Sequence, residues 1–245
     1  MNYPESRRVL SVVKVASSVF QLISEKRLLL VRNLTGYVVV LTVTSICESY
    51  FDQGDDSVLA WSYSTIHGAV FVFFAVACHR VLLLDRDSFE QDRMFRFTGR
   101  ELRFLGWSFV AYFYLLFVAM ALMIPMSIIF EYIEGSTLIL AIYISLLPGM
   151  YLFARLALLL PSTAVDQRND INWAWGLSRG NGWRLVVLVG LIPQVFTLGE
   201  TYLYGYGMLS DLLVTLMGCV FAVVEIALLS QSFRFLSGFG QESEL

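Results

Sequence analysis

Six long apolar runs constrain this chain more than any other feature of its sequence. Each is about 18 to 27 residues long, which at 1.5 Å per residue matches the roughly 30 Å hydrocarbon core of a bilayer. Strands of an outer-membrane barrel would instead alternate in polarity over segments of about ten residues. We therefore predict an all-α, polytopic membrane protein with six transmembrane helices near Leu34–Phe51, Val58–Cys78, Phe104–Phe130, Leu138–Leu160, Leu185–Tyr204 and Leu212–Phe233.

Composition supports the membrane class and excludes several others. The chain is 57% hydrophobic and 15% charged, whereas soluble domains average roughly 45–50% and 25%. Its net charge of −3 argues against a nucleic-acid partner. Cys47, Cys78 and Cys219 stand singly in apolar sequence, so we expect packed small side chains and neither a disulfide framework nor a metal site. No cofactor is expected.

The positions of the cations predict the orientation of the chain. All 17 lysines and arginines fall before the first run, between the second and third, in the fourth run and the connection after it, or after the sixth. The alternate connections, near residues 52–57, 131–137 and 205–211, carry only acidic charges. The positive-inside rule then places both termini in the cytoplasm. We expect residues 1–33 to form a cytoplasmic interfacial segment, 34–233 the transmembrane domain, and 234–245 a cytoplasmic tail.

The segment before the first run has the pattern of an amphipathic helix. Lys14 and Gln21 lie on its polar face, and the apolar residues recur at helical spacing at Val9, Val12, Val13, Ala16, Val19, Phe20 and Ile23. We predict a helix that lies in the cytoplasmic interface with its cations toward anionic headgroups. A secretory signal is disfavoured because polar residues interrupt the apolar run.

The segment after the fourth run predicts a second helix lying in the interface, at about residues 170–180. Pro161 is expected to end the span, and Asp170 to cap a short helix over Ile171–Arg179. The side chains expected to bind anionic headgroups or a partner protein are Trp173, Trp175, Arg179, Trp183 and Arg184. A catalytic loop is the alternative, but the segment contains no nucleophile, base or metal cluster.

Two charged residues of opposite sign lie in the cytoplasmic halves of the predicted spans. Arg155 and Glu225 fall at depths that differ by only about 5 Å, so the two side chains can pair across the bundle. Pairing is economical because a lone charge in a membrane helix costs roughly 2.5–3.5 kcal/mol on insertion scales. Either an interhelical brace or a site for a proton or a substrate headgroup satisfies the pattern.

Three further polar residues lie within the second span or directly after it. His67 lies near its middle, and a hydrogen bond to Thr42 or Ser45 is expected, with proton relay as the alternative. His79 and Arg80 lie near its cytoplasmic end. The histidines lack the spacing and the carboxylate neighbour of a helical metal site.

Parts of the chain resemble a known family. The segments Arg155–Pro161, Ala164–Asp166 and Trp175–Leu185 resemble the pattern of polytopic bacterial proteins related to the membrane domain of glycerophosphoryl diester phosphodiesterase. Ala77–Leu84 and Gly99–Leu105 also resemble bacterial members. The resemblance implies the non-catalytic membrane part, in the bacterial inner membrane, because a phosphodiesterase barrel would require about 200 further residues or more.

Three functional classes are compatible with these observations. We favour a non-enzymatic inner-membrane protein that binds lipid or supports a membrane-protein partner at the cytoplasmic face. A small transporter or lipid-moving protein using the Arg155 and Glu225 layer is the alternative. A membrane-embedded enzyme comes third, since no catalytic constellation is recognisable.

Overall fold

The computed structural model describes residues 9–52, 57–85, 97–130, 136–203 and 208–240, and every regular element within these ranges is helical. Six helices are long and apolar enough to cross a membrane, which confirms the predicted all-α, multi-span class. The elements are α1 Val12–Asp52, α2 Ser57–Leu83, α4 Gly99–Phe130, α5 Ser136–Leu156, α6 Leu159–Ala164, α7 Ile171–Leu177, α8 Gly182–Leu185, the π-helical η1 Val186–Leu191, α9 Ile192–Leu203 and α10 Met208–Ser237.

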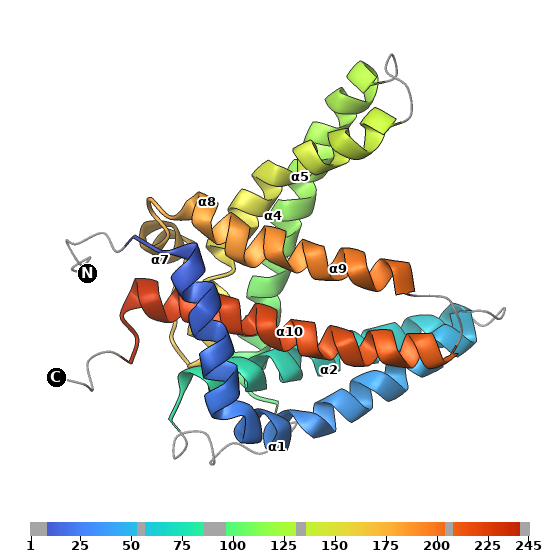
Figure 1. Cartoon of the computed structure of the whole chain (residues 1–245). Coiled ribbons are helices and arrows are strands. Elements are labelled where there is room, and N and C mark those ends of the chain that lie inside the picture. The colour runs from blue at the N-terminus through green and yellow to red at the C-terminus, as the bar shows by residue number, and fades with distance from the viewer. Residues whose placement is uncertain (1–8, 53–56, 86–96, 131–135, 204–207, 241–245) are drawn as a thin grey trace.

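The amphipathic segment and the first span form one continuous helix, α1, instead of two separate ones. The sequence contains no proline between residues 9 and 52, so nothing forces a break. Figure 1 shows α1 changing direction, so that its first half crosses the end of the bundle while its second half runs beside α2. The predicted apolar face is divided between two environments: Val19 is buried, whereas Val13 and Phe20 are exposed.

The fourth span breaks one turn before the position that the sequence predicts. The α-helix α5 ends at Leu156, and α6 continues through Pro161 to Ala164. Proline clashes with the carbonyl four residues before it and lacks an N–H. The break therefore falls at Ala157–Leu158, and Pro161 itself lies inside α6.

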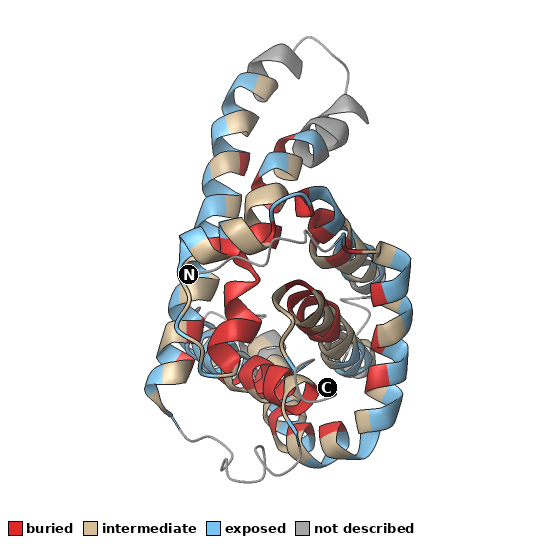
Figure 2. Ribbon diagram, turned by 90° about the vertical axis from the view of Figure 1, so that its left-hand side faces the viewer, coloured by how far each residue is buried: buried red, intermediate tan, exposed pale blue. Residues whose placement is uncertain are grey.

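Helix α10 lies at the centre of the molecule and packs against α1, α2 and α9. Seen end on, it is surrounded by the other helices (Figure 2). The hairpin of α4 and α5 leans away from this group (Figure 1). Phe109, Phe113 and Phe117 line one exposed side of α4, as expected of a surface in contact with lipid.

One end of the bundle carries the short helices α6, α7 and α8, the start of α4 and the end of α10. We call it the basic end, because its side chains include Arg80, Arg100, Arg103 and Arg168.

Lys26 of α1 also lies at the basic end. Its Nζ donates to the carbonyls of Val81, Leu82 and Leu84 at 2.8, 3.1 and 3.0 Å, and so satisfies free carbonyls at the end of α2. The acidic connections predicted for the opposite face lie largely outside the described residues.

Candidate functional site

The carboxylate of Asp166 contacts three arginines at the basic end. Arg80 Nη1 lies 3.0 Å and Arg100 Nη1 3.2 Å from Asp166 Oδ2, and Arg103 Nη2 lies 3.9 Å from Oδ1. Arg80 Nη1 also donates to the carbonyl of Ala164 at 2.9 Å. These contacts join α2, α4 and the segment after α6, so the cluster fixes three parts of the chain with one acidic side chain.

A helix-ending turn presents Asp166 to the arginines. The Gln167 amide donates to the Ser162 carbonyl at 2.9 Å, and the Asp166 amide to the Thr163 carbonyl at 3.0 Å, which is the Schellman arrangement at the end of α6. Asp166 has φ of 63°, a left-handed conformation for which glycine is the usual residue. Such a conformation costs a non-glycine residue roughly 1–2 kcal/mol. The contacts with the arginines offset this cost. Glycine has no carboxylate and could not make them.

The start of α4 aligns the arginines that reach Asp166. The Thr98 amide donates to Glu101 Oε2 at 2.8 Å, and Glu101 Oε1 accepts from Arg100 Nε at 3.0 Å. Residues Thr98 and Glu101 have the spacing of a capping box, which satisfies free amides in the first helical turn. Arg100 and Arg103 lie on or next to this first turn, directed toward the segment after α6.

A pocket of about 480 Å³ opens beside the Asp166 cluster, and we call it the interfacial pocket. Arg103 and Trp107, one turn apart on α4, form one wall, while Arg168 and Trp173 contribute from the segment after α6 and from α7. The remaining lining residues are Thr163, Gln167, Asn169 and Asp170. Two guanidinium groups, two indoles and several amide and hydroxyl groups can together bind an anionic head and the apolar part next to it.

Asp170 has a structural role at the edge of this pocket. Its Oδ1 accepts from the Trp173 amide at 2.8 Å at the start of α7, which confirms the predicted helix cap. The helix ends at Leu177, two residues earlier than expected, and the chain then turns through Gly180, whose φ is 83°. A short helix therefore begins where the sequence predicted one, and its place in the membrane interface stays a prediction.

Arg155 does not pair with Glu225, in contrast to the predicted layer. Its Nε donates to Ser178 Oγ at 2.7 Å, its Nη2 to the Trp175 carbonyl at 2.6 Å and its Nη1 to Tyr151 Oη at 3.2 Å. All three guanidinium nitrogens are thus engaged by α5 and the end of α7. The reason is the break in the fourth span, after which the chain folds back over Arg155.

The residues predicted to contact lipid fall into two groups. Trp173 packs against Phe233 and lines the interfacial pocket. The exposed group consists of Trp175, Arg179, Trp183 and Arg184. Both sets belong to the segment of α7 and α8, and the binding of lipid or a partner by these five side chains stays a prediction.

The two histidines have hydroxyl partners. His67 Nδ1 lies 3.0 Å from Thr44 Oγ1, so the predicted type of partner is right, while Thr42 and Ser45 were the wrong residues. His79 Nδ1 lies 2.8 Å from Ser230 Oγ in the fully buried contact between α2 and α10. The arrangement around His79 is that of a satisfied core residue.

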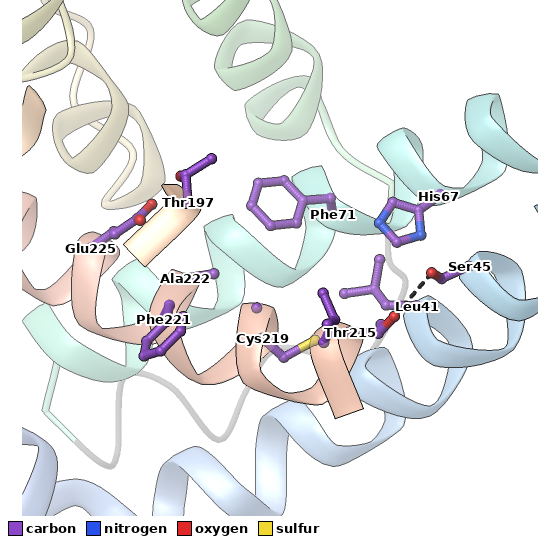
Figure 3. A pocket seen from close by; sticks show the side chains of 12 residues that line it. Leu41, Ser45, His67, Phe71, Thr197, Thr215, Cys219, Phe221, Ala222 and Glu225 are labelled. Atoms are coloured by element: carbon purple, nitrogen blue, oxygen red, sulfur yellow. Dashed lines mark hydrogen bonds between the residues drawn. The ribbon is translucent and has the colours of Figure 1, made fainter. Parts of the chain in front are cut away.

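Glu225 lies on α10 beside a second cavity, of about 600 Å³, within the spanning helices. We call it the membrane cavity. Figure 3 shows Glu225 and Thr197 at one end and His67 and Ser45 at the other. Glu225 thus borders the membrane cavity, and Arg155 is not among the described residues that line it.

No single sequence motif indicates that Asp166, Arg103, Trp107 and Arg168 form one site. In the sequence the arginines indicate only the orientation of the chain, and the spacing of Arg103 and Trp107 is the one local sign that they share a helix face. Asp166, Arg80 and the pair Arg100 and Arg103 come from three stretches of the sequence. Those stretches are separate in the chain and meet only in the fold.

No protein-family model, no curated protein and no solved structure matches this chain. A functional conclusion therefore depends on the geometry of the interfacial pocket and the membrane cavity.

Proposed function

We propose that this chain is a non-enzymatic, multi-pass protein of the bacterial cytoplasmic membrane that binds anionic phospholipid headgroups in the interfacial pocket. The basic end would face the cytoplasm, with both termini, as the positive-inside rule expects. The observation that carries the proposal is the lining of that pocket, in which Arg103 and Arg168 accompany Trp107 and Trp173.

The charge of the pocket favours an anion. Arg103 and Arg168 supply two positive charges, and Asp166, which Arg103 contacts at 3.9 Å, is shared with Arg80 and Arg100. Among the described lining residues Asp170 is the one acidic side chain, and it already accepts a hydrogen bond from the start of α7. Arg103 Nε is buried and has no hydrogen-bond partner in the described part of the chain. A phosphate oxygen is a strong acceptor for a guanidinium, and such charge-assisted bonds are about twice as strong as neutral ones.

The apolar surface beyond the pocket favours a lipid over a free phosphate. Trp107 lies one turn farther along α4 than Arg103, and tryptophan prefers the level of the glycerol backbone at the membrane boundary. Farther along the same helix face, Tyr114 and Phe117 are 40% and 60% exposed. Acyl chains of a bound lipid can follow this surface into the membrane.

Native mass spectrometry of the protein released from nanodiscs tests the proposal. The discs contain equal amounts of phosphatidylglycerol and phosphatidylethanolamine, and wild type is compared with Arg103→Gln/Arg168→Gln. We expect wild type to retain phosphatidylglycerol selectively, and the pocket variant to lose at least about tenfold of that selectivity, equivalent to about 1.4 kcal/mol.

A variant with the same change in charge provides the control. Arg179→Gln/Arg184→Gln removes two arginines that are exposed on the same end of the bundle. Loss of lipid in this control alone would move binding to the exposed tryptophan and arginine group and contradict the pocket. A membrane protein that co-purifies with wild type and disappears in either variant would instead support an accessory role toward a partner.

A small transporter is the second candidate. The observation that favours it is the membrane cavity, which places an acidic side chain and an imidazole inside the spanning bundle. In the sequence analysis the transporter alternative depended on a pair of Arg155 and Glu225; here it depends on the membrane cavity.

A further inference from the structure

We propose that the membrane cavity is a binding site for an organic cation with an apolar body, such as a protonated arylalkylamine or a quaternary phosphonium ion. The inference gives a ligand class to the transporter candidate and stands apart from lipid binding at the basic end. The two cavities share no described lining residue, so one can fail without the other.

The membrane cavity is built by four helices that cross the membrane. Leu41 and Ser45 come from α1, His67 and Phe71 from α2, and Thr197 from α9, while α10 supplies the remaining lining residues. Figure 3 shows these side chains arranged around a common space. Its volume of about 600 Å³ falls within the range of roughly 300–1,000 Å³ typical of small-molecule sites.

Charge decides which kind of ligand this cavity favours. Among the described lining residues, Glu225 is the one with a formal charge at neutral pH, and none is lysine or arginine. An ionised carboxylate in a membrane helix is costly, and residues of this kind face a cavity or a counter-ion. A cation in the cavity stabilises the carboxylate, whereas an anion is repelled by it in a medium of low dielectric constant.

The walls indicate a bulky organic cation. Phe71 and Phe221 lie on α2 and α10, and the ring of Phe221 stacks on Phe196 with centroids 4.5 Å apart, which holds it in place. Aromatic faces attract cations within about 6 Å, most strongly when both partners are desolvated. Leu41, Val214 and Ala222 provide apolar surface for the body of the ligand.

The polar groups of the cavity do not have the arrangement needed for a small metal cation. Ser45 Oγ lies 3.0 Å from Thr215 Oγ1, and His67 Nδ1 lies 3.0 Å from Thr44 Oγ1, so these groups already bond to one another. Hard cations such as Na⁺, Mg²⁺ or Ca²⁺ need several oxygens converging at about 2.0–2.6 Å. Within the described residues no group of three or more His, Cys, Asp or Glu gathers for a metal.

Cys219 provides a reporter inside the cavity. It lines the space on α10 and is half-buried, whereas Cys78 is fully buried elsewhere in the core and Cys47 lies on α1 outside the lining. The experiment measures the rate at which a membrane-permeant maleimide modifies each cysteine of the whole protein in nanodiscs, by peptide mass spectrometry. The added probes are tetraphenylphosphonium and tetraphenylborate, which share size and shape and differ in the sign of their charge.

We expect tetraphenylphosphonium to slow the labelling of Cys219 at least about fivefold without changing that of Cys47, and tetraphenylborate to have no such effect. Glu225→Gln should raise the phosphonium concentration needed for half protection by about tenfold or more, since it removes the counter-charge. Glu25→Gln, the same substitution at an exposed site on α1, should leave it unchanged.

The comparison of the two probes on wild type decides the proposal even if Glu225→Gln fails to fold. Equal protection by the phosphonium and the borate, or no protection by either, overturns the cation site. Unchanged protection in a folded Glu225→Gln protein overturns the role of the carboxylate and with it the proposal. Selective retention of phosphatidylglycerol at the basic end has no bearing on these outcomes.

Discussion

The guanidinium group of Arg155 lies over the indole ring of Trp175, with its central carbon 3.4 Å from the ring centroid. The same arginine donates to the carbonyl of Trp175 and to the hydroxyl of Ser178. One side chain of α5 therefore fixes both the ring and the backbone of α7. This contact holds the interfacial helix on the bundle and so supports the position of Trp173 in the interfacial pocket.

Replacing Arg155 with lysine should weaken this attachment. Lysine keeps the charge but loses the planar stacking and the separate bonds to Ser178 and Trp175. We expect the free energy of unfolding to fall by about 2 kcal/mol, measured by denaturant titration in detergent micelles. Arg179→Lys, at an exposed position, should change it by less than about 0.5 kcal/mol; equal effects would contradict the role of the stack.

Removal of the charge of Asp166 should destabilise the basic end. Asparagine tolerates the left-handed conformation seen at this position, where φ is 63°, so Asp166→Asn tests the carboxylate alone. Its side chain is 53% exposed, which screens the ion pairs, and we expect a loss of about 1–2 kcal/mol in unfolding free energy.

Asp170→Asn is the matched control for that substitution. Asp170 caps α7, and asparagine caps helices about as well as aspartate, so the change should be close to zero. Thermal unfolding followed by circular dichroism distinguishes the two variants. A midpoint for Asp166→Asn that coincides with that of Asp170→Asn would contradict the importance of the three-arginine cluster.

Gly182 of α8 lies against the ring of Tyr151 on α5. A Cβ at this position would overlap the ring of Tyr151, whose hydroxyl accepts from Arg155. Gly182→Ala should therefore displace the ring and reduce the unfolding free energy by about 1–3 kcal/mol. Gly68→Ala, where nothing lies within 4 Å, should be neutral or slightly stabilising. Combining Gly182→Ala with Tyr151→Leu should restore part of the loss; no restoration would argue against this clash.

The bond between His79 and Ser230 can be tested by a pair of serines on α10. Ser230→Ala leaves the buried imidazole without its partner at 2.8 Å, and we expect a loss of about 1–3 kcal/mol. Ser232 is equally buried, but its hydroxyl donates within its own helix to Leu228. Ser232→Ala should cost less than about 1 kcal/mol. Chemical denaturation of both variants checks the difference, which should vanish if His79 has another partner.

Length and polarity determine the features of this protein that could be predicted from the sequence. Apolar runs that are long enough to cross a bilayer and do not alternate in polarity form helices, because the backbone groups must be hydrogen-bonded within the segment. The cap at Asp170 and the turn at Gly180 were equally predictable, since each depends on residues within a few positions. The end of α7 was placed two residues too far.

Contacts between distant parts of the chain were decided by the tertiary structure. Depth along the membrane suggested that Arg155 would meet Glu225, but depth does not fix the rotation of a helix or the path of the chain after a break. Pro161 moved the break to the preceding turn, the chain folded back, and Arg155 met Ser178 and Trp175 instead. Glu225 was thereby left beside a cavity. The ion pairs of Asp166 could not be predicted for the same reason, because no local pattern in the sequence indicates which arginines it will contact.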